Sequence, residues 1–172
     1  MLSFSMQSPR TMSSRKSSSV LVIEEHPFQR RALARRLNEL GVPPVLEAAG
    51  GIDALELVRA NTGSIALILS SIDVPEMDGL ELLRALAAEA PRTAVAVLST
   101  LDRASLRTIE AKAVEYGLHL IGMLEKPVTD DALRAVLVRA LAGRRRRHRH
   151  SGRARGTPQM VMVWSNDGLK KY

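Results

Sequence analysis

Apolar segments and amphipathic segments alternate five times between residues 19 and 141, and this alternation limits the possible folds more than any other feature. The apolar segments are rich in Val, Ile and Leu, which is typical of strands that are buried on both faces of a sheet. They comprise residues 20–23, 45–46, 65–69, 93–98 and 118–124. The helical segments that follow them comprise residues 28–40, 52–61, 80–89, 104–116 and 130–141. The pattern predicts an α/β fold with a parallel five-stranded sheet, helices on both faces and right-handed crossovers.

The two ends of the chain differ in composition from its centre. We expect a disordered Ser-rich leader at residues 1–18, a single domain at residues 19–143 and an Arg-rich flexible tail at residues 144–172. The tail carries a net charge of +8, whereas residues 17–143 carry −4. The chain contains no cysteine, which excludes disulfides and thiolate metal sites, and no apolar run is long enough to cross a bilayer. These features predict a cytoplasmic protein with no membrane partner.

The boundaries of the last helix are marked by residues of known capping preference. Thr129 is expected to cap its N-terminus, with Asp130 and Asp131 in the first turn, where negative charge favours the helix dipole. Gly143 is expected to end it.

Polar residues follow the carboxyl ends of four of the expected strands. They are Glu24 and Glu25 after the first strand, Ser71 after the third, Ser99 and Thr100 after the fourth, and Lys126 after the fifth. Because parallel sheets place their sites at these strand ends, we expect the side chains to converge on one edge. No Gly-rich phosphate loop follows the first strand, which argues against a dinucleotide-binding site.

The order and spacing of these residues, together with Pro75-Glu-Met-Asp-Gly79, resemble the receiver domains of bacterial response regulators over about residues 20–141. The resemblance implies a flavodoxin-like (βα)5 fold, a doubly wound parallel sheet with strand order 2-1-3-4-5. In that family two acidic residues after the first strand hold Mg²⁺, and Glu24 and Glu25 match them. A hydroxyl residue and a lysine contact the phosphoryl group, and Ser99 and Lys126 match those positions.

Two positions depart from the family pattern. Ser71 stands where the family has the aspartate that accepts the phosphoryl group, and Met123 stands at the position of the switching aromatic residue. A serine hydroxyl is neutral and is a poorer ligand for Mg²⁺ than a carboxylate. We therefore expect no aspartyl phosphorylation, weak Mg²⁺ binding or none, and a salt bridge between Glu25 and Lys126.

The resemblance implies a non-enzymatic signalling module in a two-component phosphorelay that acts through protein–protein interaction. Its partner would be a histidine kinase, an EAL-type protein or another regulator, docked on the face formed by the fourth helix, fifth strand and fifth helix. The EAL class is included because residues 25–30 and 116–127 look like receivers attached to EAL-type cyclic-di-GMP phosphodiesterases.

Two other functions stay open from the sequence. The first is a working phosphorelay receiver with an unconventional acceptor. The second is binding of nucleic acid or an acidic partner through residues 144–155, a stretch rich in cationic side chains that can neutralise phosphates. Its leading arginines are Arg144, Arg145, Arg146, Arg147 and Arg149. The same stretch could instead be the remnant of a truncated or frameshifted gene.

Residues 159–168 have a strand-like run and a turn signal, but they are too short to be stable alone.

Overall fold

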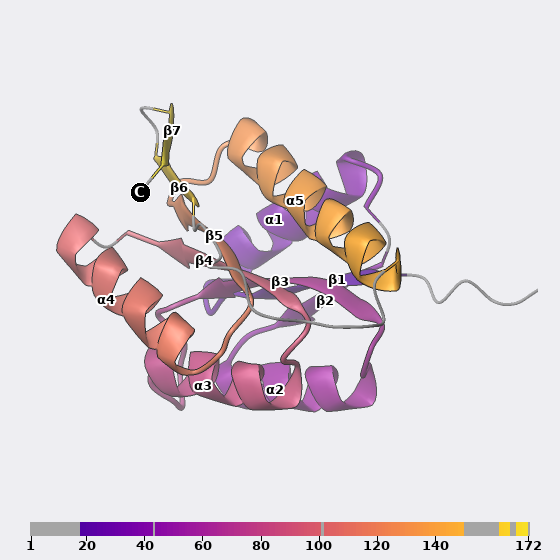
Figure 1. Cartoon of the computed structure of the whole chain (residues 1–172), viewed down its shortest axis with the longest axis horizontal. Helices are drawn as coiled ribbons and strands as arrows, with labels where there is room; N and C mark the ends of the chain where they lie inside the picture. The colour runs from indigo at the N-terminus through magenta and orange to yellow at the C-terminus, as the bar shows by residue number, and fades with distance from the viewer. Residues whose placement is uncertain (1–17, 43, 101, 150–161, 166–167, 172) are drawn as a thin grey trace, which may run out of the picture.

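The computed structural model describes residues 18–42, 44–100, 102–149, 162–165 and 168–171. Strands and helices alternate from residue 19 to residue 149, as the apolar pattern predicts (Figure 1). The strands are β1 (Ser19–Ile23), β2 (Val45–Ala48), β3 (Ile65–Ser71), β4 (Ala94–Ser99), β5 (Leu120–Glu125), β6 (Met162–Ser165) and β7 (Gly168–Lys171). The helices are α1 (Pro27–Glu39), α2 (Gly51–Ala60), α3 (Gly79–Glu89), α4 (Arg103–Glu115) and α5 (Asp130–Arg149).

A single sheet with the order β2-β1-β3-β4-β5-β6-β7 forms the centre of the molecule. The first five strands are parallel, which confirms the predicted order 2-1-3-4-5. Strand β6 adds to β5 in parallel, and β7 pairs with β6 in antiparallel orientation. The sheet is therefore two strands wider than the sequence predicts.

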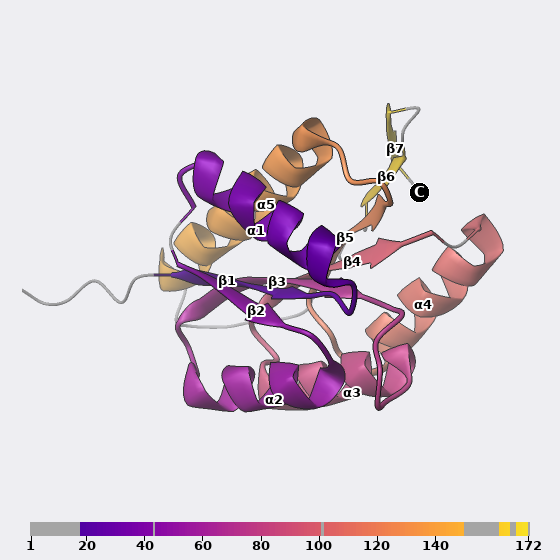
Figure 2. The ribbon, with the colours of Figure 1, turned by 180° about the vertical axis from the view of Figure 1, so that it is seen from behind.

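The helices cover both faces of the sheet, with α1 and α5 on one face and α2, α3 and α4 on the other (Figures 1 and 2). Successive residues of a strand point to opposite faces. In β1, Leu21 and Ile23 accordingly join the core under α2, α3 and α4, whereas Val20 and Val22 join the core under α1 and α5. This double burial explains why the central strands read as continuous apolar runs.

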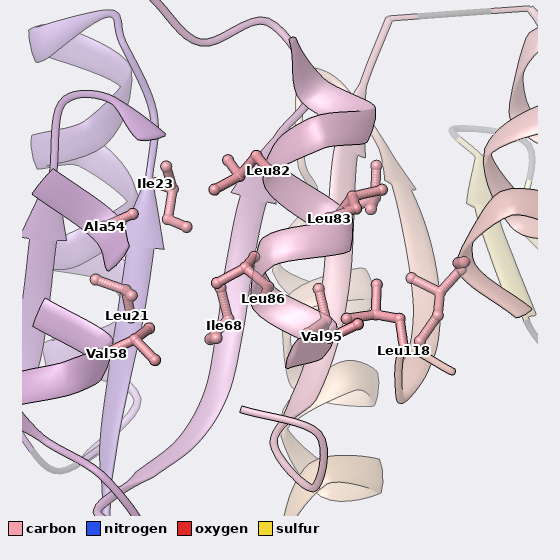
Figure 3. Packing of buried hydrophobic residues seen from close by; sticks show 14 of the residues in the cluster. Leu21, Ile23, Ala54, Val58, Ile68, Leu82, Leu83, Leu86, Val95 and Leu118 are labelled. Atoms are coloured by element: carbon pink, nitrogen blue, oxygen red, sulfur yellow. The ribbon is translucent and has the colours of Figure 1, made fainter. Parts of the chain in front are cut away.

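The core between α3 and the sheet is aliphatic. Leu82, Leu83 and Leu86 lie on one face of α3 and are fully buried, and they point toward the β1, β3 and β4 side chains (Figure 3). Ile68 of β3 and Val95 of β4 belong to the same cluster. Because α3 begins directly after the loop of residues 72–78, this packing holds the far end of the loop that follows Ser71.

The last helix confirms one expected boundary and corrects another. The Thr129 side chain accepts a hydrogen bond from the Ala132 backbone N–H at 3.3 Å, so Thr129 acts as the predicted cap. The prediction that Gly143 ends the helix is wrong, because α5 continues to Arg149. Helix interiors tolerate a glycine at a cost of about 1 kcal/mol relative to alanine.

Strands β6 and β7 lie in the segment that the sequence assigns to a flexible tail. The expected leader lies outside the described residues except for Ser18. Among the helices that the structure describes, none is both long enough and apolar enough to span a bilayer.

Candidate functional site

Four predicted site residues come together at the carboxyl edge of the parallel strands. Glu24 directly follows β1, Ser71 ends β3, Ser99 ends β4 and Lys126 directly follows β5. Glu24, Ser71 and Ser99 are buried polar residues in an otherwise aliphatic surrounding. The backbone N–H of Lys126 donates to the Ser99 carbonyl at 2.9 Å, which ties the ends of β4 and β5 together.

The Glu24 carboxylate is held at both of its oxygen atoms. Its Oε2 lies 2.6 Å from the Nζ atom of Lys126, and its Oε1 accepts the backbone N–H of His26 at 3.1 Å. The Glu24 side chain is only 2% exposed and that of Lys126 is 17% exposed. A buried carboxylate is costly to desolvate unless it is paired in this way, so the pair is an integral part of the site.

Lys126 also contacts the residue at the phosphoacceptor position. Its Nζ donates to Oγ of Ser71 at 3.0 Å, so one ammonium group bridges Glu24 and Ser71. The expected salt bridge between Glu25 and Lys126 is wrong, because Glu24 is the partner and Glu25 is exposed. The two residues are adjacent where β1 ends, but the Glu24 side chain is buried beside Lys126, whereas the Glu25 side chain is exposed to solvent. The Lys126–Pro127 peptide bond is cis.

Arg30 is a contributor that sequence reasoning missed. Its Nη1 donates to the backbone carbonyls of Glu24 at 2.7 Å and Glu25 at 3.2 Å, and its Nε lies 3.5 Å from the Glu47 carboxylate. These bonds hold the chain where it leaves β1 and therefore position Glu24. No sequence signal singles out Arg30, since it is one of several arginines spaced along the polar side of its helix.

The loop from Pro75 to Gly79 is organised by the start of α3. Asp78 caps this helix by accepting the Leu80 N–H at 2.7 Å, and Glu81 reaches back to the Asp78 N–H at 3.3 Å. This is a capping box. Gly79 is required sterically, because a Cβ atom there would lie 2.4 Å from the carbonyl oxygen of Ile72. The motif thus fixes the path of the loop that follows Ser71.

The donor set at this edge does not fit Mg²⁺ well. Mg²⁺ favours several hard oxygen ligands, and carboxylates supply the charge that balances it. Here one oxygen of Glu24 is bonded to the Lys126 ammonium and the other to a backbone N–H. The side chain at position 71 offers only a neutral hydroxyl, which is also bonded to Lys126. The Lys126 ammonium supplies the positive charge beside Glu24.

In the described part of the chain, the Ser71 hydroxyl is bonded to a donor, Lys126, and not to the base that nucleophilic chemistry would need. A serine becomes a nucleophile when an adjacent base accepts its proton. Its neighbour Lys126 is a donor to both Ser71 and Glu24, so it offers the hydroxyl no free lone pair. Ser71 is 1% exposed. Asp73, the nearest following carboxylate in the chain, is exposed in the loop rather than buried beside the hydroxyl.

Met123 occupies the core rather than the surface. Its side chain is 1% exposed and belongs to the cluster that packs beneath α2, α3 and α4. A methionine fills irregular space in such a core, and in this position it has no polar group to present to the Ser71 site.

The arginine-rich stretch is only partly described. Residues 144–149 form the end of α5, and residues 150–155 lie outside the described residues. Anion binding by Arg144, Arg145, Arg146, Arg147 and Arg149 therefore stays a prediction from the sequence.

The chain is similar to known proteins in both sequence and fold. The family model described as "Response regulator receiver domain" matches residues 20–138. The sensor histidine kinase RcsC of Salmonella typhi is 32% identical over 131 residues, which are 74% of this chain and 13% of the kinase. The autoinducer 1 sensor kinase/phosphatase LuxN of Vibrio campbellii is 31% identical over 134 residues, 75% of this chain and 14% of LuxN. The chain thus spans about a seventh or less of the length of these curated relatives.

Solved structures share the fold. A response regulator receiver domain protein from Clostridium thermocellum superposes with a TM-score of 0.65 at 23% identity, covering 74% of this chain and 97% of that one. The signal receiver domain of an HD domain-containing protein from Pseudomonas fluorescens Pf-5 gives a TM-score of 0.66 at 22% identity, covering 82% and 98%. Almost the whole length of each of these solved chains aligns with the present chain.

Proposed function

The chain belongs to the response regulator receiver domain family, and we propose that it is a receiver that signals without phosphorylation of an aspartate. Receiver domains are generally signalling modules without enzymatic activity, and they interact with histidine kinases and other signalling proteins. The observation that carries the proposal is the Lys126 ammonium, which bridges Glu24 and Ser71 at the position of the phosphoacceptor.

Two properties of this arrangement support a site that neither accepts a phosphoryl group nor needs Mg²⁺. The side chain at position 71 is a neutral hydroxyl that is buried and already hydrogen-bonded. The remaining carboxylate, Glu24, has its charge balanced by a cation of the same chain. In a receiver with an aspartate at this position, like-charge repulsion between neighbouring carboxylates favours a bound cation; here that repulsion is absent.

We propose that the module acts by binding another signalling protein, with α4, β5 and α5 as the docking face. Val114 of α4 is 70% exposed, which supports an apolar contact on this helix. A histidine kinase or another regulator is the partner class that the relatives suggest. An EAL-type partner rests on the sequence likeness of residues 25–30 and 116–127 alone. A cysteine-free chain fits a reducing compartment, and we place its action in the cytoplasm.

The test is a titration of the full, isotopically labelled chain with Mg²⁺ and beryllofluoride, a mimic of the phosphoryl group. We expect no saturable chemical-shift change at the backbone amides of Ser71, Ser99 or Lys126. A receiver that retains the aspartate serves as the positive control under the same conditions. Saturable changes at those three amides would refute the proposal and favour a working receiver with an unconventional acceptor.

A further inference from the structure

Strand β6 covers the edge of β5, which would otherwise be the outer strand of the parallel sheet. Gly122, Met123 and Leu124 of β5 are in register with residues 162, 163 and 164 of β6. Strand β7 then pairs with β6, from Met162 opposite Lys171 to Ser165 opposite Gly168. Figures 1 and 2 both place this hairpin beyond β5 at the end of the sheet. A segment more than thirty-five residues away in sequence therefore completes the hydrogen bonding of β5.

The backbone groups that β6 covers can be identified from the opposite edge of β5. The Lys126 N–H points to β4, where it donates to the Ser99 carbonyl. Successive residues of a strand direct their N–H and C=O groups alternately to the two neighbouring strands. The N–H and C=O of Met123 therefore point away from β4 and toward β6. Without β6 these groups would form part of an open strand edge, which readily pairs with any available strand.

The hairpin depends on β5 for its own stability. An isolated two-stranded hairpin is at best marginally stable in water, so β6 and β7 depend on the pairing of β6 with β5. Because the hairpin belongs to the same chain, its effective concentration at β5 is high, about millimolar for a short tether. A competing strand must overcome that concentration.

We propose that the β5 edge is a strand-binding site whose resident ligand is the chain's own β6–β7 hairpin, and that the hairpin excludes other strands from this edge until it leaves. The binding mode is strand addition, in which main-chain hydrogen bonds supply the affinity. In the described part of the chain, β7 is the last strand of the sheet on this side. The hairpin thus ends the sheet where β5 alone would leave it open.

This inference is independent of the chemistry at Ser71. It bears on the proposed function in one respect, since β5 belongs to the proposed docking face. A partner that uses the β5 edge must displace the hairpin, whereas a partner that uses the outer surface of α4 need not.

Hydrogen exchange on the full chain tests whether the hairpin is bound. Trp164→Pro removes a backbone N–H of β6 that faces the Met123 carbonyl, because Met123 lies opposite residue 163 and in parallel pairing bonds to the residues on either side of it. We expect the Met123 amide to exchange about tenfold faster or more in this variant than in the wild type, since a hydrogen bond contributes roughly 1 kcal/mol. Ala154→Pro, between α5 and β6, is the matched control and should leave Met123 unchanged. Protection of the Leu69 amide in central β3 verifies that each variant is folded.

A peptide competition tests whether the edge accepts a strand. A fluorescently labelled peptide of residues 159–172 is titrated into the wild-type chain, Trp164→Pro and Ala154→Pro. We expect Trp164→Pro to bind at least about tenfold more tightly than the other two, because its own hairpin no longer competes. Equal Met123 exchange in all three chains, or equal peptide affinity, would overturn the proposal. Either result would leave the beryllofluoride test of the proposed function unaffected, so the two failures are distinguishable.

Discussion

The Nζ atom of Lys126 lies 2.6 Å from Oε2 of Glu24, and the two residues are 102 positions apart in the chain. The contact joins the end of β5 to the end of β1 across the intervening strands β3 and β4. It places an internal cation beside the buried carboxylate, in the part of the fold where members of this family hold Mg²⁺. At this edge of the sheet, the negative charge of Glu24 is therefore balanced by the positive charge of Lys126.

Removal of the cation should destabilise the fold. Lys126→Met leaves the Glu24 carboxylate buried without a counter-charge, and breaking such a pair costs about 3 to 5 kcal/mol. We expect the free energy of unfolding in urea to fall by an amount of this order. Lys112→Met is the matched control, because Lys112 pairs with Glu115 on the surface of α4, and its unfolding midpoint should not move. A Lys126→Met variant as stable as the wild type would show that the pair contributes nothing.

Restoring a carboxylate at position 71 should create a cation site. Ser71→Asp adds a second carboxylate next to Glu24, which raises the local negative charge and supplies a hard oxygen ligand. We expect calorimetry to detect Mg²⁺ binding to this variant and none to the wild type. Ser71→Asn, which has the same shape but no charge, should also bind none. If Ser71→Asp fails to bind Mg²⁺, the bond between Lys126 and Glu24 is too strong for the metal to displace.

Two glycine substitutions should change stability in opposite directions. Gly79→Ala would bring a Cβ atom to 2.4 Å from the backbone oxygen of Ile72, and overpacking of this kind costs about 1 to 3 kcal/mol. Gly143→Ala meets no atom within 4 Å in helix α5, so it should stabilise by about 1 kcal/mol through helix propensity. Urea unfolding of both variants provides the measurement. Equal effects of the two substitutions would contradict the steric role assigned to Gly79.

The start of α4 should lose stability in acid. The Asp102 side chain accepts the backbone N–H groups of Ser105 at 2.9 Å and Ala104 at 2.8 Å, and these bonds lower the pKa of its carboxyl below the ordinary value. A lowered pKa means that the folded state favours the charged form. The stabilisation is therefore complete above the ordinary aspartate pKa and is lost as the pH falls through the lowered one.

Asp102→Asn isolates this effect, since asparagine caps a helix without titrating. The difference in unfolding free energy between wild type and Asp102→Asn should shrink as the pH falls from neutral to below the ordinary aspartate pKa. A difference that is constant across this range would show that the Asp102 charge does not support α4.

The fold could be predicted from the sequence because its central strands are buried on both faces and read as unbroken apolar runs. The convergence of Glu24, Ser71, Ser99 and Lys126 could be predicted for a similar reason, since the carboxyl ends of parallel strands share one edge. The choice between Glu24 and Glu25 could not be predicted. It depends on which of the two adjacent side chains faces inward where β1 ends, and no local sequence pattern indicates which one does.

The pairing of β6 with β5 was also beyond the sequence pattern. Residues 159–168 carry a strand and turn signal, but a strand becomes stable only when it finds a partner, and here that partner is distant in the chain. Local signals describe the segment and not the edge that receives it. The extension of α5 to Arg149 past Gly143 was missed because a single glycine costs a helix only about 1 kcal/mol and need not end it.

We propose that Ser71 and its bond to Lys126 leave this receiver unable to take up a phosphoryl group. The most direct measurement is the intact mass of the full chain after incubation with acetyl phosphate and Mg²⁺, with a receiver that retains the aspartate treated in parallel. We predict that the mass of this chain stays unchanged while the control gains one phosphoryl group. An acquired phosphoryl mass that disappears in Ser71→Ala would contradict the claim and identify Ser71 as a working acceptor.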